Sequence, residues 1–264
     1  MQIDYYHVDS FTTEQFKGNP AGVCLLKEEL PDSVLLGIAG ENGLAETAFI
    51  RKAGNNYSIR WFTPDIEMDL CGHATLASAY IIKKFIDPGC ENILFESASG
   101  SLTVTFDGEL ISMDFPKRIP VPAELPEEIY ESLSIKPVAV YKSRDYVLLY
   151  KSESDIPNLI VNRILFDRIN LGPGGVCVTA KAQSFDFISR FFTPQASISE
   201  DPVTGSAHCS LIPFWSERLG KQRMTALQAS QRSGILYCEN GQKDRVSVAG
   251  NARLYSKGLI EVDI

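Results

Sequence analysis

The 264-residue sequence has few of the residue patterns from which metal centres and disulfide frameworks are built. It contains three histidines and six cysteines, and the cysteines lie so far apart that no CxxC pair occurs. Structural zinc sites usually draw on such closely spaced pairs. Cys71-Gly72-His73 resembles half of a metal site, but no second half accompanies it. We therefore expect no metal, and free thiols rather than disulfides.

Long apolar runs and an excess of positive charge are also missing. No run reaches the roughly 20 apolar residues that span a bilayer, and residues 1–7 do not resemble a signal peptide. Lysine and arginine number 25 against 33 acidic residues, a net charge of −8, which disfavours nucleic acid and anionic membranes as partners. A small anionic substrate remains compatible, because a single pocket can be positive. We expect a cytoplasmic protein that acts on a small molecule.

A weak internal repeat is present in the chain. Residues 60–64, RWFTP, recur 130 positions later as residues 190–194, RFFTP. Three shorter matches keep the same order at offsets of 132 to 134; they are Thr47-Ala48 with Thr179-Ala180, Gly72-His73-Ala74 with Gly205-Ser206-Ala207, and Ser99-Gly100 with Ser233-Gly234. The ordered offsets predict two copies of one fold unit. The alternative is two separate domains that share common strand and turn sequences.

Apolar periodicity predicts more strands than helices in both copies. A central helix is expected from residue 72 in the first copy and over 206–219 in the second. The predicted fold class is therefore α+β, with two pseudo-symmetric halves, each a curved and mostly antiparallel sheet around a central helix. We place the halves at residues 1–118 and 119–264. The proline-rich stretch 120–131 is interpreted as the linker.

A glycine precedes the central helix in both copies, at Gly72 and Gly205. Unpaired backbone N–H groups and the helix dipole at such positions suit a carboxylate. Small ligands commonly bind where two units meet. The pair of glycines therefore predicts a small carboxylate-bearing substrate between the halves.

Polar residues found in only one copy are candidates for catalysis, because the fold does not require them. In this alignment Glu46 matches Val178, and His73 matches Ser206. A carboxyl group that is partly buried has a raised pKa, which suits proton transfer, whereas a glutamate at an exposed strand end has no such role. Asp201 shortly precedes the second central helix, where aspartate is ordinarily a turn or cap residue.

Five motifs closely resemble the signature stretches of the phenazine-biosynthesis PhzF-like family and follow the family's order; they are Gly18-Asn19-Pro20-Ala21-Gly22-Val23, Glu46-Thr47-Ala48-Phe49, Arg60-Trp61-Phe62-Thr63-Pro64, Cys71-Gly72-His73-Ala74-Thr75 and Asp201-Pro202-Val203-Thr204-Gly205-Ser206-Ala207-His208. The resemblance implies a diaminopimelate epimerase-like fold, a homodimer, no cofactor, and an isomerase. It implies that Glu46 moves a proton between two carbons of the substrate, while His73 and Asp201 hold and polarise it. The backbone groups of Gly72, Gly205 and Ser206 would receive its carboxylate.

Three other functions are compatible with parts of this pattern. A thiol-based epimerase would use Cys71 and a second thiol, but Thr204 stands at the matching position of the other copy. A cysteine hydrolase would pair Cys71 with His73, and residues two apart at a helix start are not expected to contact each other. A small-ligand-binding protein without turnover is the third. The physiological substrate, and any role in phenazine synthesis, are not specified by these motifs.

Overall fold

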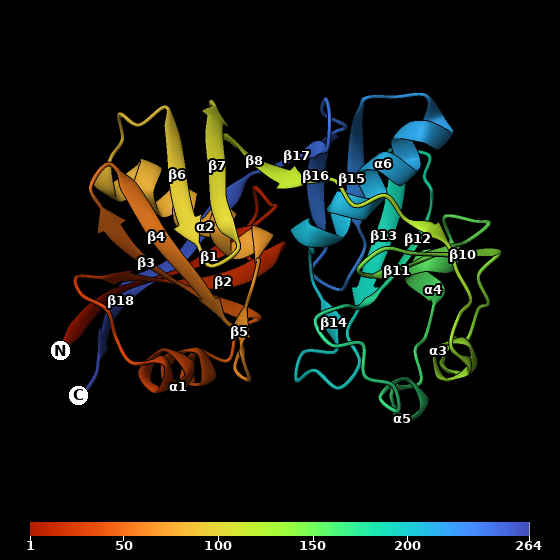
Figure 1. Ribbon diagram of the computed structural model, residues 1–264, viewed down its shortest axis with the longest axis horizontal. Helices are drawn as coiled ribbons and strands as arrows, with labels where there is room; N and C mark the ends of the chain where they lie inside the picture. The colour runs from red at the N-terminus through yellow and green to blue at the C-terminus, as the bar shows by residue number, and fades with distance from the viewer. Residues whose placement is uncertain (264) are drawn as a thin grey trace. The chain divides into compact units, whose positions relative to one another are not determined.

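The computed structural model describes residues 1–263, and the chain divides into two compact units (Figure 1). The first unit comprises Met1–Asp114 and Ala249–Ile264, and the second comprises Phe115–Val248. The chain thus returns to the first unit after completing the second, which differs from a simple division at residue 118. The reason is strand pairing, since β18 (Ala252–Glu261) runs antiparallel to β1 (Gln2–Ser10).

The first unit is a sheet in the order β18–β1–β2–β3–β4–β6–β7, followed by β8. Its further elements are β2 (Asn19–Leu26), α1 (Asp32–Asn42), β3 (Glu46–Ala53), β4 (Asn56–Phe62), β5 (Glu67–Met68), α2 (Gly72–Ile81), a π-helical turn η1 (Ile82–Ile86), β6 (Asn92–Ser97), β7 (Gly100–Asp107) and β8 (Leu110–Pro116). The pairs β2–β3 and β4–β6 are parallel, and α1 and α2 provide the crossovers that parallel strands require.

Helix α2 is the centre of the first unit, and the strands surround it in Figure 1. Every residue of α2 except Tyr80 is buried, as expected for a helix with apolar and small residues on all sides. It packs on β1, β2 and β3. Buried hydroxyls bond within its first turns, where Thr75 Oγ1 donates to the carbonyl of Cys71 at 2.6 Å and Ser78 Oγ donates to that of Ala74 at 2.7 Å.

The second unit has the same plan, with strand order β9–β10–β11–β12–β13–β15–β16 and parallel pairs β11–β12 and β13–β15. Its elements are β9 (Val121–Pro122), α3 (Glu127–Ser132), β10 (Ala139–Lys142), β11 (Tyr146–Leu149), α4 (Asp155–Asn158), α5 (Arg163–Phe166), β12 (Val176–Lys181), β13 (Phe187–Phe192), β14 (Glu200–Asp201), a 3-10 turn η2 (Gly205–Ala207), α6 (His208–Leu219), β15 (Arg223–Gln228) and β16 (Gly234–Glu239), with β17 (Arg245–Gly250) leading out. The stretch 120–131, expected as a linker, instead contains β9 and the start of α3.

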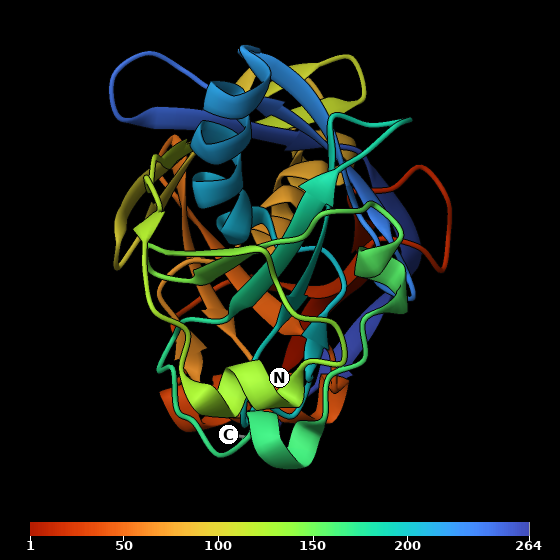
Figure 2. The same ribbon diagram turned by 90° about the vertical axis from the view of Figure 1, so that its right-hand side faces the viewer.

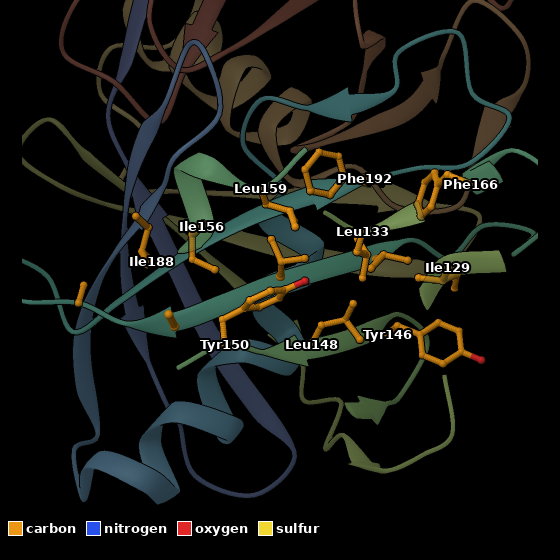
Figure 3. Packing of buried hydrophobic residues seen from close by; sticks show 14 residues of the cluster. Ile129, Leu133, Tyr146, Leu148, Tyr150, Ile156, Leu159, Phe166, Ile188 and Phe192 are labelled. Carbon is orange, nitrogen blue, oxygen red and sulfur yellow. The ribbon is translucent and has the colours of Figure 1, made fainter. Parts of the chain in front are cut away.

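Helix α6 occupies the central position in this unit. Trp215 on α6 stacks on Phe187 of β13 with ring centroids 5.7 Å apart, and its indole nitrogen donates to Thr179 Oγ1 at 3.0 Å. An apolar cluster, shown in Figure 3, joins β11, β12 and β13 to the short helices. Figure 2 shows two of these helices, α3 and α5, side by side. In the part of the chain that the structure describes, no helix has the length and apolarity to cross a membrane.

Strand registers confirm the internal repeat and the α+β fold class. Tyr57 pairs with Phe95 in the first unit, and Phe187, 130 residues after Tyr57, pairs with Ala226 in the second. Equivalent ion pairs accompany them. Arg60 contacts Glu67 through two hydrogen bonds of 2.7 Å, and Arg190 contacts Glu200 through two of 2.7 and 2.9 Å.

The expected match between Glu46 and Val178 is wrong. Thr47 pairs with Phe62 on β4, and on the equivalent strand β13 Phe192 pairs with Val176. Thr47 therefore corresponds to Val176, and Glu46 corresponds to Gly175. The short Thr-Ala match misled the alignment because it lies three residues out of the true register. Glu46 still has no acidic counterpart in the second unit.

Candidate active site

Glu46 is the first residue of β3, at the point where the chain enters the sheet next to Ala21 of β2. Its side chain is 15% exposed. A strand end places a side chain at a fixed position while leaving one side open to a ligand. Glu46 therefore belongs to the partly buried carboxylates rather than to the solvated ones.

The imidazole of His73 lies against Glu46, with Nε2 3.2 Å from Oε2. The contact is close but is not aligned as a hydrogen bond, and Nε2 is a buried atom without a hydrogen-bond partner. His73 is 3% exposed, and burial lowers its pKa to about 3. The ring is therefore neutral near pH 7, and its contact with Glu46 is not a salt bridge between opposite charges.

Cys71 contacts the other nitrogen of the same ring, with Sγ 3.5 Å from Nδ1. The expectation that Cys71 and His73 do not contact each other is therefore wrong. The expectation rested on side-chain positions within a helix, but Cys71 is the N-cap of α2 and its backbone is extended (φ −135°, ψ 110°). Its side chain therefore does not follow the helical spacing. The cysteine hydrolase cannot be set aside by that geometric reasoning.

The three side chains form a chain of contacts, Glu46–His73–Cys71, through both ring nitrogens. A neutral imidazole carries one proton, so one nitrogen donates and the other accepts. When the Cys71 thiol donates to Nδ1, the ring proton is on Nε2 and meets an ionised Glu46. When Nδ1 carries the proton, the lone pair of Nε2 faces a protonated Glu46. Both protonation states of the glutamate thus have a complementary form of the neutral ring.

Glu46, Cys71 and His73 also present ligand atoms within 4.8 Å of one another, the type of group that can hold a metal ion. A metal binds an imidazole through one nitrogen. Glu46 lies at Nε2 and Cys71 lies at Nδ1, on different sides of the ring. A metal ion bound to one of these nitrogens would therefore be coordinated by both side chains only if one of them moved to the other side of the ring. The arrangement fits proton relay through the ring better than metal coordination.

Backbone contacts hold this group in place. Ser10 of β1, itself fully buried, donates from Oγ to the carbonyl of His73 at 2.7 Å. Thr75 closes the first turn of α2 by donating to the carbonyl of Cys71. Gly72, between the two side chains that meet, is the first residue of α2 and is buried. Two buried hydroxyls therefore hold the start of α2 in place.

Asp201 lies in the second unit, on β14 opposite Phe191. Its Oδ2 accepts from Thr204 Oγ1 at 2.6 Å, and its carbonyl accepts from Gln228 Nε2 at 2.8 Å. Gln228 is fully buried and accepts from the backbone N–H of Thr204 at 2.8 Å through its side-chain oxygen. Sequence reasoning missed Gln228, because nothing near residue 228 resembles a motif.

Gly205 and Ser206 begin η2, which continues into α6. Ser206 Oγ accepts from Arg144 Nη2 at 3.0 Å, and Arg144 was not among the expected site residues. His208 is buried next to this turn, where its Nδ1 lies 2.9 Å from the carbonyl of Thr204, and burial lowers its pKa to about 4. The structure thus brings Glu46, Gly72 and His73 together in one unit, and Asp201, Gly205 and Ser206 together in the other.

Comparison with known protein families gives one match, to the family model described as phenazine biosynthesis-like protein, over residues 8–258. An uncharacterized isomerase of Pseudomonas aeruginosa is 43% identical over 263 residues, covering 99% of this chain and 100% of that protein. A human phenazine biosynthesis-like domain-containing protein is 36% identical over 290 residues, covering 98% of this chain and 99% of its own length.

Solved structures agree with these matches. A phenazine biosynthesis protein of the PhzF family from Enterococcus faecalis superposes with a TM-score of 0.93 at 42% identity, covering 99% of this chain and 100% of that one. A probable proline racemase from Agrobacterium radiobacter superposes with a TM-score of 0.65 at 10% identity, covering 99% and 93%, and shares the fold alone. The chain belongs to the phenazine biosynthesis-like family and has the epimerase-like fold of its structural relatives.

Proposed function

We propose that the protein is a cofactor-independent isomerase that moves a proton between two carbons of a small carboxylate-bearing substrate, with Glu46 as both base and acid. The observation that carries the proposal is the contact of Glu46 Oε2 with Nε2 of His73, 3.2 Å away on a buried and neutral ring. Relatives named as isomerases support the reaction class.

In the first step the Glu46 carboxylate takes a proton from a carbon of the substrate, and the electron pair of the C–H bond stays on the substrate. In the second step the resulting carboxylic acid returns that proton to a different carbon, and the carboxylate is regenerated. Nothing is consumed overall. A neutral His73 suits this cycle, because it can stabilise Glu46 in both protonation states, whereas a permanent cation would favour the carboxylate alone.

In this proposal His73 and Asp201 hold and polarise the substrate, and the backbone groups of Gly72, Gly205 and Ser206 receive its carboxylate. The support in the second unit is the buried hydrogen-bond network that fixes Asp201 through Thr204 and Gln228. A side chain whose position is fixed before the substrate binds needs no reorganisation during the reaction.

The test uses hydrogen exchange, because exchange reports proton transfer at carbon for any substrate that the protein accepts. A panel of small unsaturated carboxylates is incubated with the protein in D₂O, and loss of C–H signals is followed by ¹H NMR. Glu46→Gln is nearly isosteric but cannot take a proton, so exchange should fall by at least about a hundredfold. The matched control is Glu41→Gln, which removes an exposed carboxylate from α1 of the same unit.

Near-parental exchange by Glu46→Gln would refute the role of Glu46 and leave Asp201 as the next candidate base. Binding of panel members without exchange by the parent would instead favour the ligand-binding protein without turnover. The thiol-based epimerase is tested separately by substitution of Cys71. The expected homodimer remains a prediction, which light scattering of the purified protein in solution would check.

A further inference from the structure

The second unit holds two arginines next to the first turn of α6, and only one of them has an acidic partner. Arg144 follows β10, and its Nε and Nη2 bond to the two carboxylate oxygens of Asp145 at 3.1 and 3.0 Å. Asp145 is 1% exposed and also accepts from the backbone N–H of Gly175 at 3.0 Å. The Arg144–Asp145 pair is therefore neutral overall and is held rigidly.

Arg118 has no such partner. Its backbone N–H donates to the carbonyl of Cys209 on α6 at 3.0 Å, so the residue lies against the first turn of that helix. Its side chain makes no hydrogen bond or ion pair with any of residues 1–263, and its Nη1 is a buried atom without a partner. Arg118 is only half-buried as a residue, but a buried N–H donor such as its Nη1 is costly unless an acceptor accompanies it.

The same turn of α6 connects the two arginines to Ser206. Ser206 and Ser210 are four residues apart and so lie on one face of the turn. The chain at Ser143 and Arg144 packs on that face, through a 2.7 Å contact between Ser143 Oγ and Ser210 Oγ and the bond from Arg144 Nη2 to Ser206 Oγ. The guanidinium groups of Arg118 and Arg144 both act to lower the pKa of Cys209, which burial raises to about 11. Both positive groups are therefore near one point of the helix.

Donors remain unused at this point. Arg144 uses Nε and Nη2 for its bonds, and its Nη1 has no hydrogen-bond partner among the residues that the structure describes. Because Ser206 Oγ already accepts from Arg144, its hydroxyl hydrogen is available to donate elsewhere. Arg118 adds the donors of its unpartnered guanidinium. The sum is one net positive charge with several free N–H and O–H donors, which is the chemistry that binds a carboxylate.

We propose that Arg118, Arg144 and Ser206 form an anion site in the second unit that binds the carboxylate of the substrate. The inference rests on the proposed function, since it assigns the residues that recognise the substrate's charge. Arg118 and Arg144 supply positive charge and planar N–H donors, and the bond from Arg144 leaves the Ser206 hydroxyl as a further donor. A site of this kind selects anions, so an uncharged analogue of the same shape should bind poorly.

The experiment measures binding of benzoate, its uncharged analogue benzamide, and inorganic phosphate to the purified full chain by isothermal titration. Benzoate should bind the parent, benzamide should bind at least about tenfold more weakly, and phosphate should bind no more tightly than benzoate. Arg118→Gln should weaken benzoate binding by about tenfold or more, since hydrogen bonds to charged groups are of that strength. Arg118 has no partner to leave unpaired, so this variant should fold. The control Arg223→Gln makes the same charge change at a side chain that is 83% exposed.

Arg144→Gln alone would leave Asp145 buried and unpaired and could unfold the protein. The double variant Arg144→Gln/Asp145→Asn avoids that charge and should weaken benzoate binding by about tenfold or more, as for Arg118→Gln. Arg144→Lys should restore part of the lost binding. Absence of benzoate binding to the parent, equal binding of benzamide, preferred binding of phosphate, or unchanged binding by Arg118→Gln would each overturn the proposal.

Glu46→Gln separates this inference from the proposed function. It should bind benzoate as the parent does while failing to exchange protons. Loss of benzoate binding in Arg118→Gln together with full exchange activity in Glu46→Gln would support the anion site and refute the role of Glu46. The reverse result would refute the anion site and retain Glu46 as the proton carrier.

Discussion

Two buried histidines make the free energy of unfolding depend on pH, and they do so at pH values above those at which carboxylates titrate. Burial lowers the pKa of His73 to about 3 and that of His208 to about 4, against about 6.5 for histidine in an unfolded chain. The unfolded state therefore binds more protons than the folded state below pH 6.5. The free energy of unfolding falls as the pH is lowered through 6.5, and the loss from each histidine stops only below its folded pKa.

The magnitude follows from one proton per histidine and about 1.36 kcal/mol per pH unit. Between pH 7 and pH 5 each histidine should reduce the free energy of unfolding by about 2 kcal/mol, and the two together by about 4 kcal/mol. That is a large part of the stability of an ordinary domain. Carboxylates contribute little in this window because their usual pKa values lie below 5.

Urea unfolding between pH 7 and pH 5, followed by tryptophan fluorescence, measures the effect. The only two tryptophans are Trp61 in the first unit and Trp215 in the second, so Trp61→Phe and Trp215→Phe leave one reporter each. His73→Gln and His208→Gln should each remove about half of the pH dependence, and the two tryptophans should report the same change. A slope unchanged by either substitution, or a native histidine that titrates near pH 6.5 by NMR, would contradict the reasoning.

Three further predictions concern single side chains. Cys71→Ser keeps a hydrogen-bond donor beside His73 and should leave proton exchange within about tenfold of the parent, whereas complete loss in a folded protein would favour the thiol-based epimerase. Gly175→Ala would place a Cβ atom 2.4 Å from the ring of Phe191 and should lower the free energy of unfolding by about 1–3 kcal/mol. The control Gly37→Ala, with open space around it in α1, should be neutral or stabilising. Equal effects of the two substitutions would refute this reasoning. Thr179→Val removes the acceptor of the buried Trp215 indole and should cost about 1–3 kcal/mol in urea unfolding, and no cost would show that the indole finds another acceptor.

The repeat in the sequence was sufficient to predict two similar α+β units and their central helices. It succeeded because the residues that repeat, such as Arg60 and Arg190, make the same ion pair at the same strand position. The alignment was wrong at Glu46, because it depended there on a two-residue match, and such a short match does not fix the register of a strand. The register became clear only from the pairing of Thr47 with Phe62.

Contacts between residues distant in sequence were the part that no local pattern could show. Gln228 and Arg144 join the site residues Thr204 and Ser206 through hydrogen bonds that span 24 and 62 residues. The contact of Cys71 with His73 depended on a backbone conformation at the N-cap rather than on residue spacing. The residue types in the candidate site were thus predictable, and the partners that hold them were not.

The pairing of β1 with β18 determines the order in which the protein can mature on the ribosome. Gln2 and Glu261 hydrogen-bond although 259 residues separate them, so β1 has no partner on that edge until β18 has been synthesised. The second unit, Phe115–Val248, is complete in sequence before that moment. The unit that begins first therefore finishes last, and its open strand edge is exposed to mispairing throughout synthesis, when chaperones that cover such edges would be most needed.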